Sequence, residues 1–168
     1  MFIVKKLRII SLIAIIVLCF VGAGFAATPT DQNNIQIVQS LDLGKTYPYP
    51  SSFGLSDYKT TNAQNSIWIS CNNDKILISQ SALGKVNMII IREPSATLYG
   101  MEIGKTKWND EIVQNKYFLR QEISPNGKTI YRYYLSDTDK NVLYIALFET
   151  GHYNSSLIFT QFEKKYIQ

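Results

Sequence analysis

Runs of apolar residues separated by short polar clusters fill the chain after about residue 35, and they have the length and composition of β-strands. Each run is rich in β-branched and aromatic residues, and each ends at Gly, Asn, Asp or Ser, which is typical of strands joined by tight turns. The expected strands are 66–71, 75–79 and 86–91 in the first half, and 118–123, 129–135, 142–148 and 156–162 in the second.

The clearest turn signal is Pro125-Asn126-Gly127, between two of these runs. Asn and Gly both tolerate positive φ angles, so this pair favours a tight hairpin. We therefore expect 118–123 to pair with 129–135. With the two following strands, the second half of the chain should form a four-stranded antiparallel meander.

Helical periodicity is limited to one segment, 107–117. Thr106 can cap a helix there, and Asp110 and Glu111 would lie in the first turn, where the helix dipole favours acidic residues. Trp108, Ile112 and Val113 would form its apolar stripe. Residues 27–34 are polar and are expected to form a flexible N-terminus, with an extended, apolar pattern beginning at Ile35.

The first half of the chain repeats a short motif of the second. Residues 41–46 read Leu-Asp-Leu-Gly-Lys-Thr and residues 101–106 read Met-Glu-Ile-Gly-Lys-Thr, and strands follow both copies. We therefore expect an α+β fold whose antiparallel sheet is built from two related β-helix-meander units, 35–93 and 94–163, with one or two helices packed on one face. Pro48 and Pro50 disfavour a helix after the first copy. Because one such unit buries little apolar surface, both should share a single domain, 35–166.

The N-terminus carries an export signal. Lys5, Lys6 and Arg8 precede an apolar run over 9–21, and the small residues of Gly22-Ala23-Gly24-Phe25-Ala26-Ala27 follow. This arrangement is typical of a secretory signal peptide, with cleavage expected after Ala26 and a signal segment of 1–26. An uncleaved membrane anchor is the alternative, since the apolar stretch approaches the length of a membrane span. The protein is expected to be exported to the periplasm or the extracellular medium of a bacterium, with membrane contact only through the signal segment.

The order of strand, Gly-Lys-Thr, helix and antiparallel hairpins resembles that of small exported bacterial proteins, the outer-membrane assembly lipoproteins called SmpA or BamE. The resemblance is carried by Gly104-Lys105-Thr106 with the following helix, and by Gly44-Lys45-Thr46. A doubled unit is similar to the β-lactamase inhibitor protein fold, in which two such units join in a continuous sheet. The chain departs from the lipoproteins at the cleavage site, where no cysteine stands. The resemblance therefore implies a fold and no activity.

Charge and the supply of chemically reactive residues limit the classes of function that we expect. The formal net charge of +4 falls to about +1 without the three basic residues of the signal segment, which gives no basic footprint for nucleic acid. His152 is the only histidine, and Cys71 would be the only cysteine of the processed chain. A nucleophilic Cys71 would need a base beside it, and His152 is the only imidazole available. We expect no enzyme activity, no metal site and no cofactor.

Aromatic residues are the remaining signal, with 11 tyrosines and 2 tryptophans. In the strand 129–135, Tyr131, Tyr133 and Leu135 should face one side of the sheet, and Ile130, Arg132 and Tyr134 the other. Tyr and Arg are common on recognition surfaces. The loop residues Tyr47, Tyr49 and Phe53 are a second aromatic candidate, which could equally close the core. We expect a non-catalytic cell-envelope or secreted binding module for a protein or an envelope polymer, with Tyr131, Tyr133, Tyr47, Tyr49 and Phe53 as candidate contacts. The alternative is an inhibitor of an extracellular or periplasmic enzyme.

Overall fold

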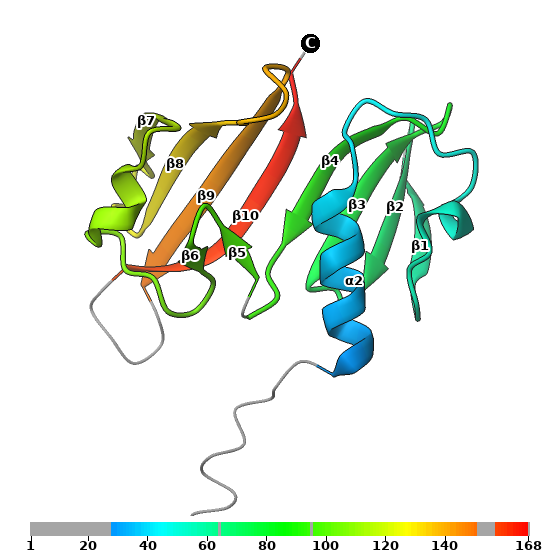
Figure 1. The fold of residues 1–168 in the computed structure, drawn as a ribbon, viewed down its shortest axis with the longest axis horizontal. Coiled ribbons are helices and arrows are strands. Elements are labelled where there is room, and N and C mark those ends of the chain that lie inside the picture. Colours follow the sequence, from blue (N-terminus) through cyan, green and yellow to red (C-terminus); the bar gives the residue numbers. More distant parts are fainter. Residues whose placement is uncertain (1–27, 64, 95, 151–156, 168) are drawn as a thin grey trace, which may run out of the picture.

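The computed structural model describes residues 28–63, 65–94, 96–150 and 157–167, and the expected signal segment 1–26 lies outside these residues. Eight strands form one antiparallel sheet in the order β1-β2-β3-β4-β10-β9-β8-β7 (Figure 1). Their bounds are β1 Lys59–Ala63, β2 Ser66–Cys71, β3 Ile76–Ser81, β4 Val86–Ile91, β7 Phe118–Ile123, β8 Thr129–Leu135, β9 Val142–Thr150 and β10 Leu157–Tyr166. A short hairpin of β5 (Thr97–Leu98) and β6 (Met101–Glu102), the helix α2 (Pro29–Ser40) and two 3-10 helices, η1 (Pro50–Phe53) and η2 (Glu111–Gln114), complete the described fold.

The sheet consists of two meanders that meet at its centre. Strands β1 to β4 pair in chain order, and so do β7 to β10. The two sets join through β4 and β10, which run antiparallel with Phe162 opposite Ile91 and Lys165 opposite Met88. An antiparallel sheet of this kind with helical segments belongs to the α+β class, as the sequence predicted.

The strand predictions are largely confirmed. All seven expected strands are present among the described residues, with ends that shift by up to four residues. The Asn-Gly hairpin is confirmed as well, because Ile123 pairs with Ile130 and Gly127 has a φ of 68°. Strand β1 was missed, since its sequence Lys-Thr-Thr-Asn-Ala is polar and all five residues are exposed. It forms because it completes the hydrogen bonds of β2 at the edge of the sheet.

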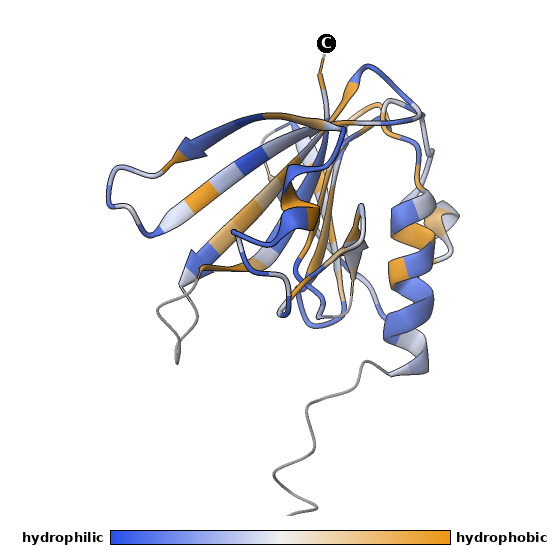
Figure 2. Cartoon of the chain, turned by 60° about the vertical axis from the view of Figure 1, so that its left-hand side comes forward, coloured by the Kyte–Doolittle hydropathy of each residue, from blue (hydrophilic) through white to orange (hydrophobic). Residues whose placement is uncertain are grey.

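Helix α2 corrects the expectation of a flexible N-terminus over 27–34 followed by an extended segment. Thr28 is the N-cap, and its side chain and that of Asp31 form a reciprocal capping box, with Pro29 at the first helical position. The helix is mostly polar, with few apolar residues (Figure 2), and it buries Ile35 and Val38 against the sheet. The strand-like apolar pattern after residue 35 therefore belongs to one face of a helix.

The prediction of a helix over 107–117 is wrong, because only the four residues of η2 are helical in this segment. The backbone N–H of Trp108 donates to the carbonyl of Leu157 at 3.0 Å, which binds the start of this segment to strand β10 as an extended chain. Only Val113 of η2 is buried. Hydrogen bonds to a distant strand therefore replace those of the predicted first helical turn.

The hydrophobic core lies on one face of the sheet, beneath α2, η1, η2 and the β5–β6 hairpin. Figure 1 shows α2 over β2 to β4 and the β5–β6 hairpin in front of β9 and β10. Phe148, Phe159 and Phe162 form the centre of the core in the second half, with ring centroids 5.4 Å and 6.1 Å apart along the series. None of the helices in the described part of the chain has the length and hydrophobicity that a membrane crossing requires.

Candidate functional site

The face of the sheet opposite the core carries a paired set of large apolar and aromatic side chains. Residues that face each other across antiparallel strands share one side of the sheet. On β8 and β9, three such pairs lie on this side, and they are Tyr131–Leu147, Tyr133–Ile145 and Leu135–Leu143. We call these six residues the β8–β9 patch. Leu135 is 42% exposed and the other five are half-buried, although none of them belongs to the core cluster.

A polar strand separates this patch from the first half of the sheet. The three pairs continue onto β10 as Gln161, Glu163 and Lys165. Gln161 accepts a hydrogen bond from Arg92 Nε at 2.6 Å and donates one to Glu163 at 3.0 Å. Beyond β10 the same rows reach a second group of apolar residues, which are Ile90, Met88, Leu77 and Trp68. From β8 to β2, this face therefore carries an apolar zone, a polar zone on β10 and a second apolar zone.

Tyr133 is the best anchored residue of the β8–β9 patch. Its hydroxyl donates to the Glu122 carboxylate at 2.8 Å, and the guanidinium of Arg120 lies 4.3 Å from its ring centroid. Burial, followed by the neighbouring Glu122 carboxylate, raises the pKa of the Tyr133 hydroxyl. The expected alternation along β8 is confirmed, because Ile130, Arg132 and Tyr134 point into the core side. The ring of Tyr133 is thus held in one orientation by two charged neighbours.

The aromatic candidates of the loop 47–53 lie apart from the β8–β9 patch, and they differ from one another in exposure. Phe53 is a core residue, 5% exposed, which corrects its assignment as a contact residue. Tyr47 packs on Phe53 with ring centroids 4.8 Å apart and is half-buried. Tyr49 is 69% exposed and is the accessible aromatic side chain of this loop. Phe53 is inward because η1 turns the chain back toward the core.

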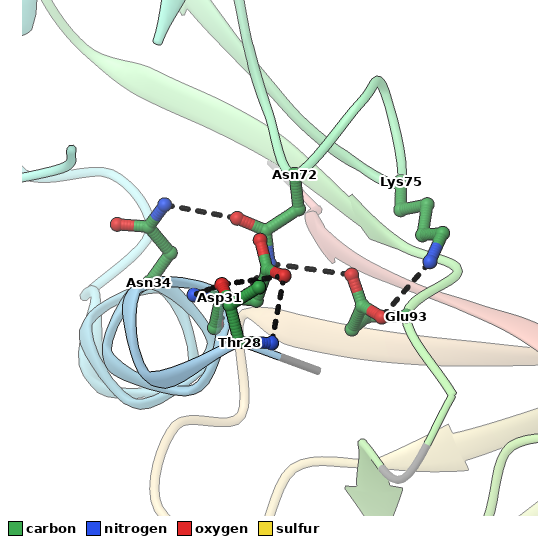
Figure 3. A network of polar contacts seen from close by, with 6 residues as sticks. All are labelled: Thr28, Asp31, Asn34, Asn72, Lys75 and Glu93. Atoms are coloured by element: carbon green, nitrogen blue, oxygen red, sulfur yellow. Dashed lines mark hydrogen bonds and ion pairs between the residues drawn. The ribbon is translucent and has the colours of Figure 1, made fainter. Parts of the chain in front are cut away.

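A buried polar network lies under helix α2 (Figure 3). Asn34 donates to Asn72 Oδ1 at 2.9 Å, and Asn72 donates to the Glu93 carboxylate at 3.3 Å and to the Asp31 carbonyl at 3.1 Å. Lys75 pairs with Glu93 at 3.2 Å, and Glu93 is only 2% exposed. Because these polar groups have partners, the network ties α2 to the β2–β3 turn and to the segment after β4.

Of the two reactive residues that the sequence offers, the structure describes Cys71. Cys71 is buried beside the network, and burial, with smaller effects from Asp31 and Glu93, raises the pKa of its thiol to about 12. A thiol with so high a pKa is a poor nucleophile. His152 lies outside the described residues. Within the ranges that the structure describes, no three His, Cys, Asp or Glu side chains gather in a way that could hold a metal ion.

The fold is that of an α+β protein with an eight-stranded antiparallel sheet, and the described segments outside the sheet pack on one of its faces. No protein-family model matches the chain, and no curated protein and no solved structure shows significant similarity to it.

Only part of the β8–β9 patch was predicted from the sequence. Tyr131 and Tyr133 were identified, but Leu143, Ile145 and Leu147 were not. The turns between the strands could have identified these three residues. The Asn-Gly hairpin fixes the orientation of β8, and the short turn over 136–141 fixes the pairing of β8 with β9. Residues 143, 145 and 147 then fall opposite 135, 133 and 131.

Proposed function

We propose that the protein is an exported, non-catalytic binding module whose uncovered sheet face binds another protein. The observation that carries the proposal is the β8–β9 patch, six large apolar and aromatic side chains in paired register on a face outside the core cluster. Tyrosines held at one orientation contribute strongly to protein recognition, because little side-chain entropy is lost on binding. The charged row of β10 beside the patch would supply a polar rim.

The partner should present an aliphatic or aromatic surface to the β8–β9 patch. Glu163 and Lys165 lie next to each other on the same side of β10, so the polar rim has both signs of charge. This mixture favours a protein partner over a uniformly charged polymer, which would be attracted to a rim of one sign. An envelope polymer remains the alternative ligand class.

The proposal of export is supported by the N-terminal pattern of Lys5, Lys6 and Arg8, the apolar run over 9–21 and the small residues before Ala27. We propose that a signal peptidase removes residues 1–26 and that the protein works in the periplasm or outside the cell. Thr28, the N-cap of α2, would then be the second residue of the processed chain.

We also infer that the two halves descend from one duplicated unit. In both motif copies the glycine has a positive φ, 80° at Gly44 and 85° at Gly104. In both, the lysine pairs with the acid three residues earlier, as in Lys45–Asp42 and Lys105–Glu102. Each copy then docks on the last strand of its own meander, since Gly44 donates to Val86 on β4 and Gly104 donates to Phe159 on β10, both at 2.8 Å. A shared sequence motif with the same backbone conformation and the same docking supports common origin.

Site-specific photocrosslinking in the native host tests the binding proposal. A photoreactive side chain at Leu147 lies within the β8–β9 patch, and a matched one at Leu83, 87% exposed in the β3–β4 turn, lies outside it. We expect one dominant protein adduct from position 147 and none of that mass from position 83. The recovered chain should begin at Ala27.

The double variant Tyr131→Ala/Tyr133→Ala should abolish this adduct while the far-ultraviolet circular dichroism spectrum stays unchanged. Tyr49→Ala, which removes an exposed tyrosine outside the patch, is the control. An adduct that forms equally from position 83, or that persists in the double variant, would show that the uncovered face is not the binding surface.

A second candidate function is inhibition of an extracellular enzyme through the loop 47–53. Tyr49 stands exposed between Pro48 and Pro50, and its carbonyl accepts a hydrogen bond from the backbone N–H of Ser52 at 2.9 Å. A stiff loop with one protruding ring can enter a cleft at low entropic cost. Loss of the adduct in Tyr49→Ala, with retention in the double variant, would favour this function.

A further inference from the structure

Arg132 is a buried cation without a hydrogen-bond partner at two of its nitrogens. It lies on the core side of β8 and is 2% exposed. Its Nε and Nη1 atoms are buried, and neither has a partner among the described residues. The ion pairs of the described chain join Lys45 to Asp42, Lys75 to Glu93, Lys105 to Glu102 and Arg120 to Glu122, and none of them includes Arg132.

Two aromatic rings surround the guanidinium and do not replace a counter-ion. Trp108 and Phe118 have ring centroids 5.9 Å and 5.5 Å from its central carbon. Such cation–π contacts are weaker than a charge-assisted hydrogen bond to a carboxylate. An arginine remains charged at all physiological pH values, so it cannot avoid the cost of burial by losing a proton. Buried charges in proteins are normally paired, which makes this site incomplete by itself.

A cavity of about 520 Å³ that is open to solvent adjoins Arg132 on the core side of the sheet, and its lining residues other than Arg132 are exposed. Its walls are formed by Trp108, Asn109, Asp110, Glu111, Gln114 and Arg132. The lining combines one fixed positive charge, two carboxylates, two side-chain amides and an indole. Asp110 and Glu111 are exposed, and one oxygen of Asp110 accepts the backbone N–H of Lys107 at 2.7 Å.

The charges of this cavity determine which ligand fits. A carboxylate would neutralise Arg132, and its two oxygens suit the donors of a guanidinium. Because Nε and Nη1 of Arg132 have no exposed surface, the ligand would reach them only by displacing a covering side chain such as that of Trp108. The two acidic residues disfavour a ligand with several negative charges, such as phosphate, through like-charge repulsion. They favour a ligand that also carries an ammonium group. Asn109 and Gln114 can hydrogen-bond to either group.

We propose that this cavity binds a small zwitterion of the α-amino-acid type, with its carboxylate on Arg132 and its ammonium on Asp110 and Glu111. The site lies on the core side of the sheet, opposite the β8–β9 patch, and is independent of protein binding there. Trp108, which lines the cavity and is 38% exposed, would cover the ligand.

Nuclear magnetic resonance of the indole N–H groups tests the proposal on the processed chain. The protein has two tryptophans, Trp108 in the cavity and Trp68 on the opposite face, so Trp68 is an internal control. Titration with alanine should shift the Trp108 signal with saturation and leave the Trp68 signal in place. Acetate, which has only the carboxylate, and methylammonium, which has only the cation, should each bind at least tenfold more weakly.

Variants separate the two charges of the ligand. Asp110→Asn/Glu111→Gln should weaken alanine binding at least tenfold and leave acetate binding unchanged or stronger. Asp74→Asn, which removes an exposed acid at the β2–β3 turn, should have no effect. Arg132→Met should abolish binding of alanine and of acetate while the protein stays folded, because an apolar residue replaces an unpaired buried charge.

Three results would overturn the proposal. The first is a Trp108 signal that does not move with alanine up to about 10 mM, roughly ten times a dissociation constant of 1 mM at the weak end of the affinity scale. The second is acetate binding as tight as alanine binding, which would indicate a site for anions alone. The third is alanine binding that survives in Arg132→Met.

Discussion

The two motif glycines allow a matched test of how the chain packs at its two halves. Gly44 and Gly104 have nearly the same φ, 80° and 85°, but different surroundings. A Cβ added at Gly104 would meet no atom within 4 Å. A Cβ added at Gly44 would lie 2.8 Å from Cε2 of Tyr166 and 3.2 Å from Cζ of the same ring. Alanine at each position should therefore cost different amounts of stability.

The expected magnitudes follow from these two environments. Placing alanine in the left-handed region costs about 1–2 kcal/mol, and this term is common to both variants. Gly44→Ala must also displace the ring of Tyr166, which the Lys85 ammonium contacts at 4.6 Å from the ring centroid. Overpacking of this kind costs about 1–3 kcal/mol, and the half-buried ring can move, so the lower end applies. We expect a loss of about 1–2 kcal/mol for Gly104→Ala and about 2–3 kcal/mol for Gly44→Ala.

Urea denaturation followed by tryptophan fluorescence measures both free energies of unfolding. The variants Tyr166→Ala and Gly44→Ala/Tyr166→Ala complete a double-mutant cycle. In the background without the ring, Gly44→Ala should cost about as much as Gly104→Ala, since only the backbone term remains. Equal losses for the two single variants, or an additive cycle, would refute the assigned contact between Gly44 and Tyr166.

Two further predictions concern the N-terminal half. Thr28→Ala removes the N-cap of α2 and should destabilise the protein by about 1 kcal/mol in urea denaturation. The control is Thr30→Ala, at an exposed position of the same turn, which should change stability by less than about 0.5 kcal/mol. Similar losses for the two variants would contradict the capping box. Cys71 should not react with a thiol reagent at pH 8 in the folded protein and should react at once in urea. Since its pKa rises on folding from 9.0 to about 12, the contribution of Cys71 to stability should be constant below pH 9 and decrease as the pH rises above it, which a comparison of the protein with Cys71→Ala measures. Rapid labelling of the native protein would show that the thiol is accessible.

Local signals predicted most of the sheet because strands and tight turns depend on neighbouring residues. The Asn126-Gly127 pair fixes a hairpin through its own backbone preferences, and the alternation along β8 follows from the pleat. The capping box at Thr28 was equally local, with proline after the cap and aspartate at the third helical position. It was overlooked because a polar N-terminus was read as flexible, although the helix needs only Ile35 and Val38 on its buried face.

The errors arose where distant segments compete with local preference. The apolar residues of 107–117 have helical spacing. The pairing of the start of this segment with strand β10 nevertheless stabilises the fold more than a partly exposed helix would. The inward position of Phe53 likewise depends on the packing of η1 against the sheet. Sequence periodicity contains no information on which remote strand will offer a free edge.

The sequence by itself determined seven strands of the large sheet, the hairpin at Asn126-Gly127 and the two sides of β8. Which of these sides is buried was decided by the tertiary structure, because α2, η1, η2 and the β5–β6 hairpin all pack on the side of Tyr134. That choice leaves Tyr131 and Tyr133 on the other face and encloses Arg132 beside the rings of Trp108 and Phe118, which come from other segments of the chain. Strand alternation is a property of neighbouring residues, whereas burial is a property of the assembled layers.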